Sequence, residues 1–202
     1  MADSSDEHYF SADPAVPFRR VPVTFSAWGH SLSVDSGSGV FAQGRLDAGT
    51  AVLLRETAPP AGGRILDLGC GYGAIGLAIA RAVPSTTVTA IDVNERAVLL
   101  ANENAASLGL SSQFSAVTPA SVPGDATYDE LWSNPPIRIG KAALHELLLT
   151  WFARLVPGGR AVMVVGKNLG GDSLQRWLGE QGYPTSRVGS AKGFRVLESR
   201  HP

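Results

Sequence analysis

The sequence predicts an α/β fold: a seven-stranded, mostly parallel sheet with helices on both faces and an antiparallel strand at its C-terminal end. From residue 64 onward, short apolar runs alternate with longer segments of helical spacing, which is the pattern of βαβ units. The last two strand-like runs are separated only by residues 189–193, which indicates a hairpin. At 202 residues, with 44% hydrophobic and 17% charged, the chain is long enough for one domain with a sizeable core.

The N-terminal part is expected to extend this core. Residues 1–14 are acidic and polar and predict a disordered tail. Two short strands are predicted at Val21–Phe25 and Ser31–Val34, followed by a turn at 36–39 and a helix at Leu46–Thr57 that the prolines at 59 and 60 end. We therefore predict a single domain over residues 15–202, with an N-terminal extension at 15–60 and a catalytic core at 61–202.

The core is predicted to alternate strands and helices in a fixed order. Its strands are expected at Arg64–Leu68, Thr87–Ile91, Gln113–Val117, Tyr128–Trp132, Arg160–Val165, Thr185–Val188 and Phe194–Glu198. Its helices are expected at Ala74–Val83, Glu95–Leu108, Ala142–Leu155 and Asp172–Gln181, and Val156-Pro157-Gly158-Gly159 should end the third of these.

A glycine-rich loop follows the first core strand in the segment Asp67-Leu68-Gly69-Cys70-Gly71-Tyr72-Gly73. Glycines let the backbone pass close to a ligand where any Cβ would collide. Asp92 closes the next strand, where its carboxylate can accept hydrogen bonds from both hydroxyls of a ribose. In an open α/β sheet both features lie at the carboxyl edge, so they predict a Rossmann-like site for a nucleoside-containing cofactor.

Two cofactors compete for this loop, because residues 71–76 also match the G-x-G-x-x-G pattern of dinucleotide-binding proteins. Asp67 favours S-adenosylmethionine over a dinucleotide. A carboxylate at the strand end suits the cationic amino-acid moiety of S-adenosylmethionine and would repel a pyrophosphate.

The loop and Asp92 together resemble the class I S-adenosylmethionine-dependent methyltransferases. The resemblance implies that the loop borders the methionine and ribose. That family often has Asp or Asn after the third strand to meet the adenine amino group; here Thr118, or a backbone carbonyl nearby, takes that place. The expected cofactor-binding residues are Asp67, Gly69, Cys70, Gly71, Gly73, Asp92, Val93, Thr118 and Asn134.

A second motif, Asn134-Pro135-Pro136, follows the fourth strand and therefore lies at the same sheet edge. The prolines fix the backbone, and the residue before each is held extended. The Asn134 amide oxygen and a backbone carbonyl of Asn134 or Pro135 can then accept both N–H bonds of a planar amine. Positioning the amine for in-line attack supplies much of the catalysis.

This corner resembles the N-P-P-[FYIW] motif of amino-methyltransferases, and it predicts Asn134, Pro135, Pro136 and Ile137 as the catalytic group. Ile137 replaces the aromatic residue that stacks on the target base.

The longer string 133–141, with 38–41, 46–50 and 193–197, is similar to the small-subunit ribosomal RNA guanine-N2 methyltransferases (the RsmC-like family). The resemblance implies N2 of a guanine in 16S rRNA as acceptor. It also implies that Phe41, Asp47 and Gly49 lie near the methionine end of the cofactor and the acceptor pocket.

The charge pattern bears on the substrate. The net charge is −1, although most Lys and Arg residues lie beyond residue 137. This asymmetry indicates either a phosphate-facing side or solvated helix faces. Arg138 and Lys141, just past the acceptor corner, are predicted to meet phosphates of a splayed-out nucleotide.

Other features restrict the class of protein. Cys70 is the only cysteine and the four histidines show no metal-ligand spacing, so we expect a cytoplasmic protein without a metal. No apolar run is long enough to cross a membrane. The expected partner is ribosomal RNA or the small ribosomal subunit, and the expected state is a monomer or weak homodimer. The alternatives are methylation of a small molecule or protein amide, a NAD-dependent oxidoreductase, and a non-catalytic binding module.

Overall fold

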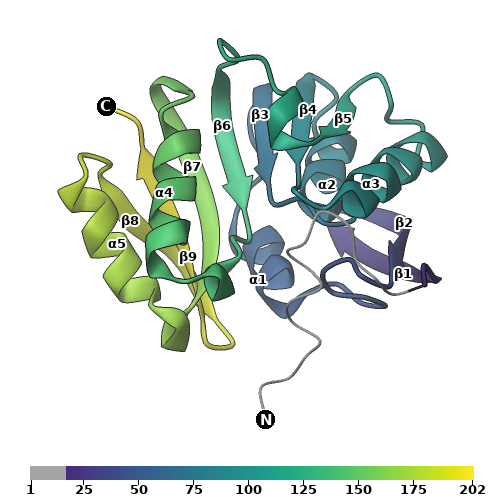
Figure 1. Ribbon diagram of the computed structural model, residues 1–202, viewed down its shortest axis with the longest axis horizontal. Helices are drawn as coiled ribbons and strands as arrows, with labels where there is room; N and C mark the ends of the chain where they lie inside the picture. The colour runs from purple at the N-terminus through teal and green to yellow at the C-terminus, as the bar shows by residue number, and fades with distance from the viewer. Residues whose placement is uncertain (1–16) are drawn as a thin grey trace.

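The computed structural model describes residues 17–202 and shows a seven-stranded sheet covered by helices on both faces (Figure 1). The tail expected at 1–14 lies outside the described residues. The sheet has the order β5-β4-β3-β6-β7-β9-β8. Its strands are β3 (Gly63–Leu68), β4 (Thr86–Ile91), β5 (Phe114–Val117), β6 (Tyr128–Ser133), β7 (Leu155–Gly166), β8 (Thr185–Ala191) and β9 (Phe194–Arg200).

The strand directions confirm the predicted sheet. Neighbours from β5 to β7 run parallel, whereas β9 runs antiparallel to both β7 and β8. The order reverses between β3 and β6, because the chain moves from β3 outward to β5 and then returns to the other side of β3. Leu68 pairs with both Ile91 and Ser133, so the ends of β3, β4 and β6 are level. Ligands of open α/β sheets bind at such a reversal, beyond the carboxyl ends of the strands.

Successive side chains of the strands point to opposite faces and build two apolar layers. Ile65 belongs to the layer under α1 (Ala48–Glu56), α2 (Ala74–Ala82) and α3 (Glu95–Ser107). Leu66, the next residue, belongs to the layer under α4 (Lys141–Phe152) and α5 (Gly171–Glu180). Three short 3-10 helices, η1 (Pro119–Ser121), η2 (Ile137–Ile139) and η3 (Lys167–Leu169), follow β5, β6 and β7. Within residues 17–202, no helix combines the length and apolar character needed to cross a membrane.

The N-terminal extension forms an antiparallel hairpin of β1 (Arg20–Ala27) and β2 (His30–Gly37), longer than the two strands predicted. Asn104 of α3 joins this hairpin to the core: its Nδ2 donates to the Asp35 carbonyl and its Oδ1 accepts from the Asp35 N–H, each at 2.8 Å. The hairpin thereby fixes where the following loop, residues 38–46, begins. That loop crosses the carboxyl edge of the sheet.

One predicted boundary is wrong. The sequence predicts that residues 156–159 end a helix and precede the strand, but α4 already ends at Phe152 and β7 starts at Leu155. Leu155 pairs with Tyr128, and regular pairing resumes only at Arg160 with Glu130. The Pro-Gly-Gly segment is therefore an irregular part of β7. Backbone pairing on both sides of it outweighs the local turn propensity of proline and glycine.

Candidate functional site

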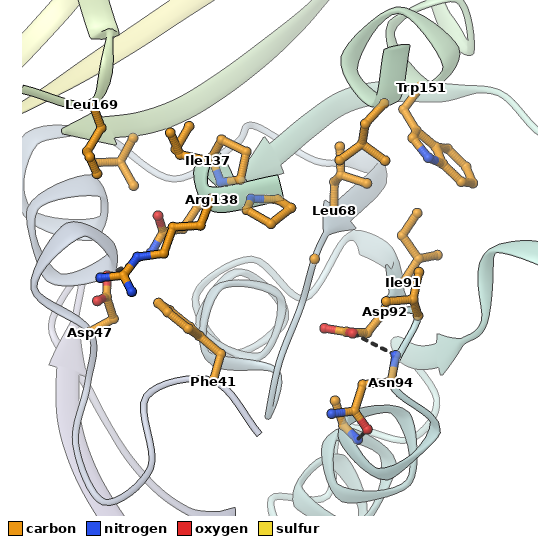
Figure 2. A pocket seen from close by; sticks show the side chains of 18 of the residues that line it. Phe41, Asp47, Leu68, Ile91, Asp92, Asn94, Ile137, Arg138, Trp151 and Leu169 are labelled. Atoms are coloured by element: carbon orange, nitrogen blue, oxygen red, sulfur yellow. Dashed lines mark hydrogen bonds between the residues drawn. The ribbon is translucent and has the colours of Figure 1, made fainter. Parts of the chain in front are cut away.

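A cavity of about 340 Å³ opens at the carboxyl edge of the sheet, where the strand order reverses. Figure 2 shows Asp92 and Asn94 toward one end of it and Asp47 and Arg138 toward the other. Its wall includes Leu68 and Gly69 at the end of β3, Ile91 to Asn94 at the end of β4, and Asn134 to Arg138 after β6. Its volume lies in the range of small-molecule sites. The two motifs predicted from the sequence thus share one cavity.

The glycine loop is fixed by bonds to the end of β4. The N–H groups of Gly69 and Cys70 both donate to the Ile91 carbonyl at 2.9 Å, and the N–H of Gly71 donates to Oδ2 of Asp92 at 2.9 Å. Burial raises the pKa of Asp92, while hydrogen bonds from Asn94, Gly71 and Val93 act in the opposite direction. Gly69 lines the cavity, and Cys70 and Gly71 line a smaller hollow beside it that Asn134 also borders.

Asp67 requires a correction, because it does not line the cavity. It is fully buried at the end of β3, and its Oδ2 accepts a hydrogen bond of 2.8 Å from the N–H of Gly76 in α2. Burial raises its pKa to about 7, although the bond from Gly76 lowers it. The β pleat turns this side chain into the layer under α2, so it braces the helix behind the loop rather than facing a ligand.

Gly73 and Thr118 also lie off the wall. Gly73 has a φ of 91°, and a Cβ there would come within 3.0 Å of Leu77, so this glycine serves the close packing of α2. Thr118 shares a hydrogen bond with Ser121 at 3.1 Å, whereas its neighbour Pro119 lines the cavity. The adenine role expected for Thr118 has no support in this geometry. Val93, by contrast, is half exposed and lines the cavity.

Asn134 lies at the centre of the acceptor corner. Its Nδ2 donates to Oδ1 of Asp47 at 2.7 Å and to Oγ1 of Thr50 at 3.1 Å. Asn134 lines the cavity, and its Oδ1 atom remains as the acceptor group of the amide. Pro135, Pro136 and Ile137 continue the wall, and the Pro135 carbonyl already accepts from the N–H of Ile137 at 2.8 Å. A carbonyl oxygen has two lone pairs, so one acceptor position is left.

The five residues predicted to bind the substrate divide into two groups. Phe41, Asp47 and Arg138 line the cavity, and Phe41 is 43% exposed at its mouth. Gly49 is buried in the first turn of α1, where a Cβ would come within 3.0 Å of Asp47 Oδ1, and Lys141 is exposed at the start of α4. Neither lines the cavity, so direct contact with substrate is not supported for these two.

Several wall residues have no signal in the sequence. They come from the second half of the sheet and its helices, and they are Leu147, Trp151, Val164, Gly166 and Leu169. Phe194 also lines the wall, and it belongs to the string 193–197 on which the family resemblance rests. Trp151 packs in the layer under α4 and still reaches the wall near Ile91 (Figure 2). In the sequence these residues are indistinguishable from core residues, because the same apolar residue types line a binding cavity and pack in the protein interior.

The geometry agrees with the comparisons to known proteins. Residues 31–198 match the family model of the methyltransferase small domain. The chain is 38% identical over 175 residues to a ribosomal RNA small subunit methyltransferase C of Ectopseudomonas mendocina, covering 84% of this chain and 51% of that protein. It is 34% identical over 197 residues to an uncharacterized protein, YbxB, of Bacillus subtilis, covering 96% of this chain and 98% of that protein.

Among solved structures, the fold is similar to a Thermus thermophilus 16S rRNA N2 methyltransferase (RsmC) in complex with AdoMet and guanosine. The TM-score is 0.77 at 23% identity, covering 94% of this chain and 52% of that one. The chain spans about half the length of the ribosomal RNA methyltransferases that it matches. It belongs to the methyltransferase small domain family, which confirms the predicted resemblance and the predicted fold.

Proposed function

We propose that this member of the methyltransferase small domain family transfers a methyl group from S-adenosylmethionine to the exocyclic N2 of a guanine in 16S ribosomal RNA. The observation that carries the proposal is that Asp92 and Asn134 line one and the same cavity. A site for a nucleoside-containing cofactor and an acceptor for an amine share one space. Direct transfer between two bound groups requires this arrangement.

The residues at the Asp92 end fit S-adenosylmethionine. Asp92 offers a carboxylate for the ribose hydroxyls, Gly69 leaves backbone bare at the wall, and Ile91, Val93 and Pro119 form apolar surface for a base. When bound, this cofactor supplies a sulfonium methyl group that an amine can attack in line. The chain's own contribution is to hold the cofactor against the glycine loop and to keep the acceptor end facing it.

At the other end, Asn134 is suited to an amine rather than to a hydroxyl alone. Its Oδ1 and a backbone carbonyl of the Asn-Pro-Pro corner can accept the two N–H bonds of an NH2 group. Holding both hydrogens in this way discourages delocalisation of the nitrogen lone pair into the ring. Ile137 can cover one face of the base by apolar contact. Methyl transfer leaves the amine nitrogen positively charged, which makes its N–H protons acidic. One of these protons is then lost, so no strong base is required.

Ribosomal RNA is the acceptor that the relatives favour. Two relatives that are 38% and 34% identical to this chain are named ribosomal RNA small subunit methyltransferase C, and the solved Thermus thermophilus structure holds guanosine. Arg138 on the cavity wall provides a cation for the phosphate of a splayed-out nucleotide. Because this chain matches only about half of those proteins, its RNA target and its assembly state, a monomer or weak homodimer, are part of the proposal.

Mass spectrometry of nucleosides tests the proposal. 16S rRNA from cells lacking the protein should lose one N2-methylguanosine, and the purified protein with S-adenosylmethionine should restore it. The Asn134→Ala protein serves as the matched control and should restore none. Unchanged N2-methylguanosine in the deletion strain, with no methyl transfer to rRNA in vitro, would refute the rRNA assignment and favour a small-molecule or protein acceptor.

A further inference from the structure

One carboxylate oxygen connects the acceptor corner to a helix that is distant in sequence. Oδ1 of Asp47 accepts hydrogen bonds from the N–H groups of Gly49 at 2.8 Å and Thr50 at 3.0 Å, which caps α1. The same oxygen accepts from Nδ2 of Asn134 at 2.7 Å. A single atom therefore serves both the helix N-terminus and the side chain predicted to bind the reacting amine.

This contact decides which way the Asn134 amide faces. A carboxylate can only accept hydrogen bonds, so the NH2 half of the amide must point to Asp47. The hydroxyl of Thr50 lies 3.1 Å from the same nitrogen and adds a second acceptor. A flipped amide would set its oxygen against the carboxylate and turn its own NH2 toward the substrate amine, where two donors would meet without an acceptor.

Helix α1, which begins next to Asp47, is firmly packed against the sheet. Val52 and Leu53 of α1 are fully buried in the apolar layer that includes Val162, Val164 and Val196 of the sheet. Gly49 leaves the space that the carboxylate occupies, since a Cβ there would come within 3.0 Å of Asp47 Oδ1. Helix α1 thus holds the carboxylate in place while the Asn-Pro-Pro backbone holds the amide from the other side.

We propose that Asp47 is the positioning residue that fixes the Asn134 amide in the one orientation able to accept a hydrogen bond from the reacting amine. The proposal rests on the proposed function, because it assigns Asn134 Oδ1 to the substrate NH2 group. It gives Asp47 a role in place of direct substrate contact: Asp47 acts through Asn134. Capping of α1 explains why an Asp is favourable at this position. The bond to Asn134 additionally requires a side chain long enough to bring an acceptor oxygen to Asn134 Nδ2.

Three substitutions separate the capping from the positioning. Asp47→Ser keeps an N-cap oxygen but is one bond too short to contact Asn134 Nδ2. Asp47→Asn keeps a carbonyl oxygen for all three bonds. Asp47→Ala loses both roles. We expect Asp47→Ser to lower kcat by about 100-fold, as for loss of one oriented acceptor or donor, with a Tm near that of the wild type. Asp47→Asn should lose less than about tenfold, and Kd for S-adenosylmethionine should stay within about threefold in both.

Exchange of the pair gives a second measurement. Asn134→Asp sets two carboxylates against each other and should lower kcat by about 100-fold or more. Asp47→Asn combined with Asn134→Asp removes the repulsion between the two carboxylates, so the double variant should recover at least tenfold over Asn134→Asp. A double variant no faster than Asn134→Asp, or an Asp47→Ser protein with wild-type kcat, would overturn the proposal.

A readout without substrate distinguishes failure of this proposal from failure of the proposed function. In 15N-labelled protein, the Asn134 side-chain NH2 signal is identified by its loss in Asn134→Asp. Its hydrogens should be protected from exchange in the wild type and in Asp47→Asn, and exposed in Asp47→Ser. Protection lost in Asp47→Ser supports the positioning role even if rRNA is not the acceptor. Equal exchange in wild type and Asp47→Ser refutes it whatever the substrate.

Discussion

The carboxylate of Asp92 accepts a hydrogen bond from the backbone N–H of Gly71 at 2.9 Å, and so joins the ends of β4 and the glycine loop after β3. Its other oxygen accepts from the N–H of Asn94 at 2.9 Å (Figure 2). Asn94 in turn donates to the Gly39 carbonyl at 2.7 Å, which ties the loop carrying Phe41 to the same point. Asp92 therefore organises this end of the cavity, in addition to the role in ribose binding that we propose for it.

Asp92→Ala should weaken binding of S-adenosylmethionine by about 10- to 100-fold, because hydrogen bonds to a charged group and the anchor of Gly71 are lost together. Isothermal titration calorimetry measures this change. Asp125→Ala, at an exposed position away from the cavity, is the matched control and should bind normally. Thermal stabilisation of the wild type by NAD, but not by S-adenosylmethionine, would contradict the cofactor assignment.

Asn134→Ala should lower kcat by about 100- to 1,000-fold, since it removes an acceptor for the reacting amine. Its affinity for S-adenosylmethionine should change less than about threefold, because the ribose and base contacts lie at the other end of the cavity. Single-turnover methyl transfer and calorimetry measure the two quantities. Unchanged turnover would remove Asn134 from the mechanism.

Arg138 and Lys141 should differ in their effect on RNA binding. Arg138→Ala removes a cation from the cavity wall and should raise KM and reduce the salt slope of RNA affinity by about one unit. Lys141→Ala, outside the cavity, should change the slope alone, and the double variant should flatten it further. Filter binding over a range of salt concentrations provides the data. A salt slope that is the same in the double variant and the wild type would argue for an acceptor other than RNA.

Asp67 should make stability depend on pH. Burial raises its pKa from the ordinary 3.8 to about 7 in the folded protein. Between these values the folded protein holds a proton that the unfolded chain has lost, so this group's contribution to the free energy of unfolding falls as pH rises from about 4 to about 7. Asp67→Asn removes this dependence.

Chemical denaturation of both proteins across that pH window measures this change. As pH rises, the free energy of unfolding of Asp67→Asn should increase relative to that of the wild type by a few kcal/mol, on the order of 1.4 kcal/mol per pKa unit. A constant difference between the two proteins from pH 4 to pH 7 would show that Asp67 titrates normally.

The elements that could be predicted are those with a local cause. The alternation of apolar runs with helical spacing produced the strand and helix order, because burial on both sheet faces requires apolar strands and one-sided helices. The position of Asp92 and Asn134 at strand ends was enough to place them at one edge, since parallel strands end on the same side. The start of β7 was less accurate, because long-range pairing of Leu155 with Tyr128 decides it.

The sequence alone thus determined the fold class, the glycine loop and the positions of Asp92 and Asn134. Each of these can be recognised from residues that are near one another along the chain. Only the tertiary structure decided that Asp67 is buried behind the loop and that Phe194 and Leu169 wall the cavity. It also decided that Asp47 holds the Asn134 amide. The physical reason is that a side chain's direction and partners follow from the packing of distant elements, and no local pattern in the chain records which elements meet.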